Sequence, residues 1–523
     1  MSLRERVGDL FGGKEQVNLT EGGIGKPLFV LALPIVITNL LQTAYNLADT
    51  FWLGQYSTEA LAAISFAFPM VFLLISLGLG ISVAGSVLVA QNTGAGDDRQ
   101  AEYAASQTVT FALVASVFLG AAGFFFVDDL LVIFGASPGV LEAATAYMRV
   151  ISLGLPFMFG FFIFISLMRG YGDTITPMLV MLGTVILNVA VDPFLINGWW
   201  LFPELGIEGA AYATVFSRGL AMVVGLGIML NGTRGVRIRP EDMVPDLDYS
   251  RKMLRIGIPA SIEGTGRAAS VNALLIVVGA FATPVVAGFG IGIRVFSVIF
   301  LPAIAVARAV ETMAGQNIGA GQPDRAELAA DFAAKVTFLV LGGVGVLIFL
   351  FPAPIVAVFT DDPAVIGTGA EFLRYVSLTF GFIGILRAYT GAFRGAGRTL
   401  VAAVVAITFL GLVRLPVAAA LALGVGPTTL GLAGVTVAVP RLVVGMGPVG
   451  IWWAFVVSNL VGAALAFAWF KRGTWRDADV RGGPGGPDER AATGEEGDGT
   501  ADGRPVGDGS GTGTCERSPG DDD

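Results

Sequence analysis

The sequence contains no histidine, a single cysteine and few charged residues. Without histidine, a catalytic triad based on that residue, a histidine metal site and a histidine proton relay are all excluded. The lone Cys515 allows no intramolecular disulfide and no zinc or iron–sulfur site, and we expect no bound cofactor. Only 14% of the residues are charged, about half the share of an ordinary soluble protein. A water-soluble enzyme is therefore excluded.

Apolar residues make up 54% of the 523 residues, and the mean hydropathy is +0.74. A helix needs about 20 apolar residues to cross a bilayer. Apolar runs of this length lie at 28–53, 60–90, 103–127, 145–168, 176–197, 209–230, 253–281, 284–315, 328–351, 370–393, 399–423 and 449–470. We therefore predict an all-α polytopic protein of the cell (plasma) membrane with 12 transmembrane helices.

Lys and Arg gather in alternate short loops, as the positive-inside rule describes. They occur in the first 25 residues, at Arg99 and Arg169, and in the polar segment between the sixth and seventh runs. The intervening loops carry mainly acids, for example Asp128 and Asp361. Both termini are accordingly expected in the cytoplasm.

The residues from 473 onward are glycine-rich and hold 13 acids against 5 arginines, a net charge of −8. This composition predicts a disordered acidic tail, and the lack of a basic aromatic cluster argues against nucleic acid as a partner. The expected organisation is a cytoplasmic arm (1–25), a first bundle (26–232), a cytoplasmic linker (233–249), a second bundle (250–472) and the tail (473–523).

The chain contains an internal repeat. The motif QNTGAG at 91–96 returns as QNIGAG at 316–321, an offset of 225, and Pro259 follows Pro34 at the same distance. Arg-Gly-x-Gly at 169–172 likewise returns at 394–397, and a later rise of the offset to 241 indicates an insertion of 16 residues near 427–448. Each repeat holds six crossings, so we predict two six-helix bundles related by a pseudo-twofold axis along the membrane normal.

Both motifs are interpreted as turns at helix ends. No Lys-Ser/Thr follows the glycines, which excludes a nucleotide-binding loop. The arginines of Arg-Gly-x-Gly are attributed to the positive-inside bias alone.

Acidic residues inside a crossing cost about 2.5–3.5 kcal/mol each on insertion scales, so each one needs a reason. Asp49 shares one face of the first crossing with Asn39, Gln42 and Asn46. Asp192 lies one turn beyond Asn188 in the fifth crossing and precedes Pro193, which is expected to loosen that turn. With Thr214 and Ser217 of the sixth crossing, these residues form a candidate cation-binding cluster; simple hydrogen-bond acceptors near the interface are the alternative.

The second half has no copy of this cluster. It contains Glu263 with Arg267 and Arg308 with Glu311, whose spacing predicts neutralising pairs on one helix face. Arg294, Arg387 and Arg414 also fall at membrane depth without an assigned role.

These features of the sequence resemble those of the multidrug and toxic compound extrusion (MATE) antiporters. The resemblance rests on Ala-Leu-Pro at 32–34, Tyr-Asn-Leu-Ala-Asp-Thr-Phe-Trp at 45–52, the paired motifs and the six-plus-six layout, and it covers about residues 20–472. The DinF-like archaeal and bacterial branch is the nearest match, and the acidic tail suggests a halophilic archaeal source.

The resemblance implies coupling-ion binding, with Na⁺ possible, at Asp49, Asn188 and Asp192, and less securely at Thr214. Asn39, Gln42, Asn46, Ser166 and Ser217 are expected accessory lining. Related members often add an Asn from the fourth crossing, whereas Ser166 is the nearest polar group here, and Pro34 is the expected hinge.

From these observations we expect a monomeric secondary-active antiporter that exports small organic, cationic and amphipathic compounds in exchange for Na⁺ or H⁺ across the lipid bilayer. Two alternatives stay open. A flippase for lipid-linked saccharides would share the fold and is favoured by the unassigned arginines. A membrane-embedded enzyme is disfavoured because no catalytic motif is found.

Overall fold

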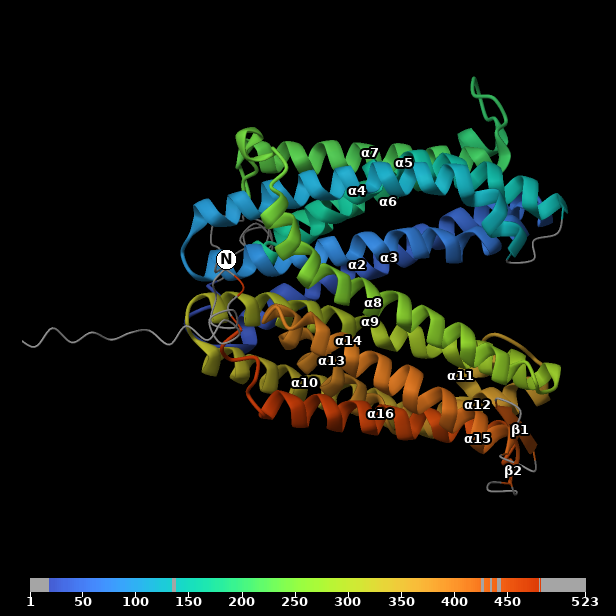
Figure 1. Ribbon diagram of the computed structural model, residues 1–523. Coiled ribbons are helices and arrows are strands. Elements are labelled where there is room, and N and C mark those ends of the chain that lie inside the picture. Colours follow the sequence, from blue (N-terminus) through green and yellow to red (C-terminus); the bar gives the residue numbers. More distant parts are fainter. Residues whose placement is uncertain are drawn as a thin grey trace, which may run out of the picture. The chain divides into compact units, whose positions relative to one another are not determined.

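The computed structural model describes residues 18–133, 138–424, 428–432, 435–439, 444–478 and 480. Each of the first six apolar runs lies within one long helix (Figure 1). These helices are α2 (Gly25–Tyr56), α3 (Thr58–Gly94), α4 (Asp98–Ile133), α5 (Pro138–Tyr171), α6 (Ile175–Asn197) and α7 (Gly206–Asn231).

The second half repeats this plan with more breaks. Its elements are α8 (Leu247–Val278), α9 (Thr283–Gly319), α10 (Pro323–Leu350), α11 (Pro352–Ala357), α12 (Pro363–Ser377), α13 (Phe380–Gly395), α14 (Thr399–Ile407), the π-helix η2 (Thr408–Arg414), α15 (Leu415–Leu423) and α16 (Pro448–Lys471). Helices α12 and α13 form one crossing bent by 53°. Helices α14 and α15 join through η2 into another.

Ten helices of the described chain are long and apolar enough to cross a membrane, and the bent pair is an eleventh crossing. Helix α8 is the twelfth, with 32 residues but a lower hydropathy because it carries Glu263 and several arginines. The 12-crossing prediction is therefore confirmed.

Local sequence explains where several helices begin and end. The Ser57 hydroxyl accepts a hydrogen bond from the N–H of Ala60 (3.0 Å) and caps α3. Asp246 caps α8 by accepting from the N–H groups of Asp248 and Tyr249. Gly198, which ends α6, has a φ of 67°, a conformation that favours glycine.

The insertion in the second repeat contains a β-hairpin. Strand β1 (Thr428–Leu432) pairs antiparallel with β2 (Val435–Val439). The all-α prediction therefore needs this one addition, which lies outside the crossings.

The linker between the halves is docked on α4. It contains the short helix η1 (Pro240–Asp242), and Arg99 forms an ion pair with Asp242. The hydrogen bond that Arg99 donates to Asp242 holds the pKa of this carboxyl group below its usual range. The Gln107 amide donates to the main-chain carbonyls of Asp242 (2.6 Å) and Val244 (2.7 Å). The linker is thus fixed to the first half.

The two halves meet through reciprocal contacts. The side-chain amide of Gln91 donates to the carbonyl of Gly395 (3.1 Å), and that of Gln316 donates to the carbonyl of Gly170 (3.1 Å). Gln316 and Gly395 are the repeat equivalents of Gln91 and Gly170 at the offset of 225. Exchanged contacts of this kind define a twofold relation. Helix α3 also packs against α8 and α9 across the same interface.

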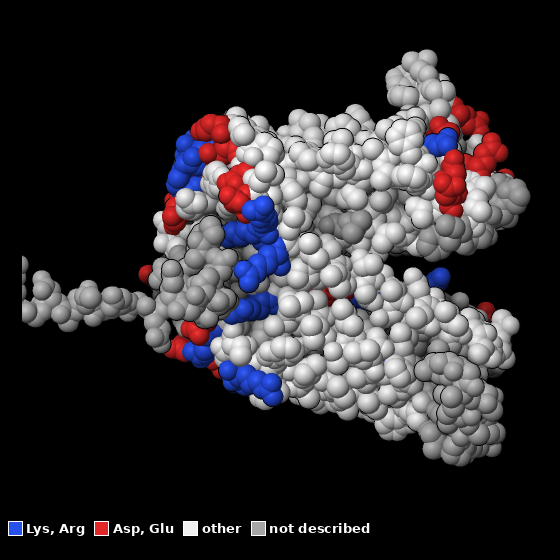
Figure 2. All heavy atoms as spheres, viewed as in Figure 1, with Lys and Arg blue, Asp and Glu red and all other residues white. Residues whose placement is uncertain are grey.

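Charge is distributed unevenly along the helices. In Figure 2, Lys and Arg gather at the end where α4 begins, whereas acids dominate the opposite end. This pattern agrees with the basic loops that the sequence places there.

The segment after α16 folds against the bundle, which corrects the expected start of the tail at 473. Trp475 is fully buried and stacks on Phe470 with ring centroids 4.5 Å apart. Ala478 is buried as well. Residues 481–523, expected as the disordered part of the tail, lie outside the described residues.

Candidate cation-binding site

Four of the residues predicted to bind a cation come together between α2, α6 and α7. Asn188 and Asp192 are fully buried, and Asp49 and Thr214 keep 7% and 5% of their surface exposed. The Asn188 amide donates to Asp192 (2.9 Å). The Asp49 carboxylate lies within interaction range of Asp192, Asn188 and Thr214. Helix packing thus joins residues that are far apart in the sequence.

This cluster contains buried oxygen atoms without partners. Asp49 Oδ1, Asn188 Oδ1, Asp192 Oδ2 and Thr214 Oγ1 are enclosed, with no hydrogen-bond partner among the described residues. Buried polar atoms are normally satisfied, and exceptions need an explanation. Carboxylate, amide and hydroxyl oxygens are the ligands of hard cations. The arrangement therefore fits a small cation, or a proton on one carboxylate.

Arg218 of α7 is a neighbour that sequence reasoning missed. Its guanidinium lies 4.4 Å from the ring centroid of Tyr45 and donates to Oε1 of the Gln42 side chain (2.8 Å). It also acts electrostatically on Asp49. The signal was available, because Arg218 lies inside the sixth apolar run, where an ionisable residue needs a reason.

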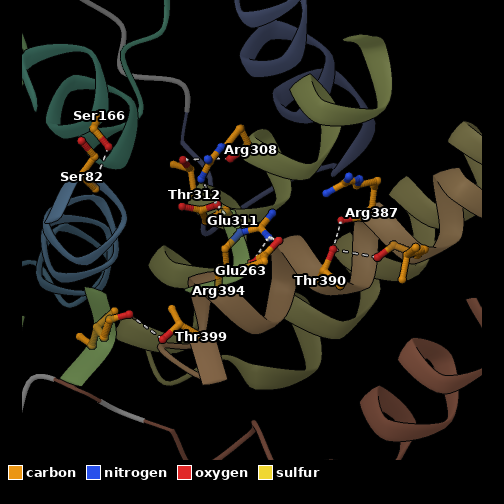
Figure 3. A network of polar contacts seen from close by, with 12 residues as sticks. Ser82, Ser166, Glu263, Arg308, Glu311, Thr312, Arg387, Thr390, Arg394 and Thr399 are labelled. Atoms are coloured by element: carbon orange, nitrogen blue, oxygen red, sulfur yellow. Dashed lines mark hydrogen bonds and ion pairs between the residues drawn. The ribbon is translucent and has the colours of Figure 1, made fainter. Parts of the chain in front are cut away.

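The accessory residues have different surroundings. Gln42 donates to Asn46 (3.1 Å), so the polar face of α2 is linked to Arg218. Asn39 Nδ2 and Ser217 Oγ are buried without partners among the described residues. Ser166 instead donates to the carbonyl of Ser82 on α3 (2.7 Å; Figure 3).

The two prolines flanking this region are both within continuous helices. Pro34 is buried inside α2, and its carbonyl accepts from the Thr38 hydroxyl (2.8 Å). Helix α6 continues through Pro193 to Asn197, so the expected loosening does not interrupt the helix.

A second buried cluster links α8, α9 and α13 (Figure 3). Arg267 contacts Glu263 (2.9 Å) and Arg308 contacts Glu311 (2.9 Å), which confirms both predicted pairs. Arg394 contacts Glu263 (3.1 Å) and Glu311 (3.0 Å) at once. The attribution of Arg394 to the positive-inside bias alone is therefore wrong, because this arginine joins three helices.

Arg414 and Arg294, which also fall at membrane depth, have different surroundings. Arg414 donates to Ser458 (2.9 Å) and Asn459 (2.7 Å), so its charge has polar partners within the second half. Arg294 is exposed on α9.

Comparisons with known proteins agree with this architecture. The sequence model of the MatE family matches residues 34–194 and 259–420, more than half of the chain. A probable multidrug resistance protein NorM of Thermotoga maritima is 33% identical over 406 residues, which are 76% of this chain and 85% of that protein. An FAD transporter of Shewanella oneidensis is 29% identical over 78% of this chain and 90% of its own length.

A solved structure described as the outward-facing conformation of a multidrug resistance MATE family transporter superposes with a TM-score of 0.78. It shares 25% identity and covers 88% of this chain and 98% of its own. The match to both repeats, together with the 12-crossing fold, identifies the chain as a member of the MatE family, a multi-pass membrane transporter and not an enzyme.

Proposed function

We propose that this transporter is a secondary-active antiporter that exports small amphipathic organic compounds in exchange for Na⁺ or H⁺. The observation that carries the proposal is the set of oxygens on Asp49, Asn188, Asp192 and Thr214 that have no hydrogen-bond partner in the described part of the chain. Such a set of buried oxygens has no evident function in a protein that only binds a substrate. It is explained when a cation or proton enters and leaves during each cycle.

Charge balance supports coupling at this site. Two carboxylates this close repel strongly when they are enclosed by helices, and the repulsion ends when a cation or proton is shared between them. Arg218 supplies part of the compensation through its charge near Asp49. Binding and loss of the coupling ion therefore change the electrostatics of α2, α6 and α7 together.

The contacts between the halves support a rocking mechanism. Gln91 and Gln316 close the end of the interface where α3 and α9 terminate. In our proposal, entry of the coupling ion from outside favours the state in which this end is closed and the substrate is released. Loss of the ion on the inside favours opening of this end. The two ligands are coupled because each has different contacts in the two states.

Several finer points belong to the same proposal. The protein is a monomer in the plasma membrane with both termini in the cytoplasm, and Pro34 acts as the hinge of α2. The chain belongs to the DinF-like branch of the family and comes from a halophilic archaeon. The substrate is taken to carry a positive charge, in keeping with the acidic residues of the first bundle. The names of the relatives, multidrug resistance protein and FAD transporter, support export of organic solutes.

The flippase remains the alternative function. Of the arginines that favoured it, Arg414 is accounted for by Ser458 and Asn459, whereas Arg387 forms no ion pair within the described chain. This lack of an ion pair at Arg387 is the observation that supports the flippase as the alternative.

The test uses the full-length protein in proteoliposomes loaded with ethidium. An imposed Na⁺ gradient and an imposed pH gradient are applied separately, and dye movement is followed by fluorescence. Uphill movement driven by either gradient supports the proposal and identifies the coupling ion. Movement that only follows the dye gradient, in well-incorporated protein, would refute coupled antiport.

A further inference from the structure

A cluster of charged side chains in the second bundle contains more positive charge than its two carboxylates neutralise. The charged side chains of this cluster are Glu263, Arg267, Arg308, Glu311, Arg387 and Arg394. Four arginines against two glutamates leave an excess of two positive charges. A cluster that only held helices together would be neutral, because every extra charge at membrane depth is costly.

Arg394 alone is sufficient to link the three helices of this cluster. It is 5% exposed and contacts both Glu263 and Glu311, so it links α13 to α8 and to α9. Arg267 and Arg308 each share a carboxylate that Arg394 already contacts. Their side chains keep 31% and 26% of their surface exposed, so a ligand can reach them.

Arg387 forms no ion pair in the described part of the chain. It is 7% exposed, and its Nε is buried with no hydrogen-bond partner among the residues that the structure describes. Its guanidinium lies 4.5 Å from the ring centroid of Phe300, within electrostatic range of Arg267, Arg394 and Arg308, which repel it, and of Glu263, which attracts it. In Figure 3 it extends from α13 toward the other charged side chains. Three cationic neighbours against one carboxylate leave the buried guanidinium under-compensated, and a bound anion would stabilise it.

The surroundings of Arg387 also favour an apolar group. Phe300 stacks on Phe296 with ring centroids 5.6 Å apart, and both rings are only partly buried. An aromatic wall beside a cationic centre suits a molecule with an apolar body and an acidic group.

We propose that Arg387, with Arg267 and Arg308, binds the carboxylate or phosphate group of an amphipathic substrate. The Phe296–Phe300 pair receives the apolar part of the same molecule. This inference rests on the transport function proposed above and adds an anionic group to its substrate class. The anion is either part of a soluble solute or the headgroup of a lipid.

The first experiment measures binding of carboxyfluorescein to the purified full-length protein by fluorescence anisotropy, with no ion gradient. We expect saturable binding, weakened about tenfold or more by Arg387→Gln, because a charge-assisted hydrogen bond is lost. Arg387→Lys keeps the positive charge and should restore part of the affinity. The matched control, Arg294→Gln, removes one charge from the same bundle outside the cluster and should bind like the wild type.

The second arm identifies the source of the anion. Transbilayer movement of fluorescent NBD-phosphatidylglycerol is measured in proteoliposomes of the same variants. Dye binding that depends on Arg387 assigns the site to a soluble solute, and lipid movement that depends on Arg387 assigns it to a headgroup. The proposal is overturned if neither process responds to Arg387→Gln in protein whose elution profile and thermal unfolding match the wild type.

A separate result distinguishes this site from the function on which it rests. If wild-type protein binds carboxyfluorescein through Arg387 but no gradient drives ethidium, coupled export of cations fails and the anion site stands. If ethidium is driven uphill and Arg387→Gln changes neither anionic probe, the anion site fails and antiport stands.

Discussion

The main-chain N–H of Val480 donates to the side-chain carbonyl of Gln91, 3.0 Å away. The segment that follows the last helix thereby reaches the end of α3, where the two bundles meet. The Val480 side chain packs against the buried Val83, Val87 and Ala260 of α3 and α8. Residues 473–478 and Val480 are thus part of the closed interface and not part of a free tail.

Truncation should therefore have two outcomes, depending on its position. Ending the chain after Arg481 should leave gradient-driven efflux close to wild type, since every described contact is retained. Ending it after Gly473 removes the buried Trp475 and the bond from Val480 to Gln91, and should lower efflux severalfold. Both variants are compared at equal incorporation, and equal activity would show that the segment has no part in closure.

Two glycines should be essential for closing the bundles. A Cβ atom on Gly94 would lie 1.9 Å from the carbonyl oxygen of Gln316, and one on Gly319 would lie 1.9 Å from that of Gln91. Overpacking costs about 1–3 kcal/mol, so Gly94→Ala should shift the balance toward the open interface by about tenfold or more.

The shift can be measured by cysteine labelling. Thr312, which is buried at this interface, is replaced by Cys in a Cys515→Ser background, and labelling by a membrane-impermeant maleimide should rise with Gly94→Ala. Gly342→Ala on α10 meets open space and serves as the control. Unchanged labelling with full transport would contradict a role of close α3–α9 contact.

Asp49 and Asp192 should behave as one site. Asp49→Asn and Asp192→Asn should each reduce gradient-driven ethidium efflux by about tenfold or more, because Asn removes the negative charge that binds the coupling ion. The double variant should be little worse than either single one, since both act on the same step. Retention of uphill efflux in both single variants would place ion coupling elsewhere in the protein.

Glu263→Gln should act mainly on stability. Glu263 is buried and contacts both Arg267 and Arg394, and removal of one partner of such a pair costs about 3–5 kcal/mol. We expect a lower midpoint of thermal unfolding in detergent, with gradient-driven transport retained per folded molecule. A normal midpoint combined with lost coupling would give this residue the role proposed here for the first bundle.

Arg218→Gln tests the neighbour of the cation site. Loss of its positive charge near Asp49 should strengthen binding of the coupling ion, so the apparent KM for that ion should fall by about tenfold. The maximal rate should fall as well, because the ion leaves more slowly. Arg218→Lys keeps the charge and should behave closer to wild type, and a raised KM in Arg218→Gln would contradict this account.

The sequence was sufficient for the crossings and for their symmetry. In a bilayer, each backbone polar group must be satisfied within its own helix, so a long apolar run has one structural outcome. The offset of 225 between the two QNxGAG motifs likewise implied the twofold relation that Gln91 and Gln316 display. The cost of an acid inside a crossing singled out Asp49 and Asp192 before their surroundings were known.

Only the tertiary structure decided what these motifs contact. Gln91 bonds to Gly395, 304 positions away, and to Val480, 389 positions away. Arg394 likewise serves two glutamates on other helices. Local periodicity shows which face of a helix is polar, but the partner of that face depends on how whole helices pack. For that reason the crossings followed from the sequence, whereas the closed interface, the place of Arg218 and the unpaired charge of Arg387 emerged only from the assembled bundles.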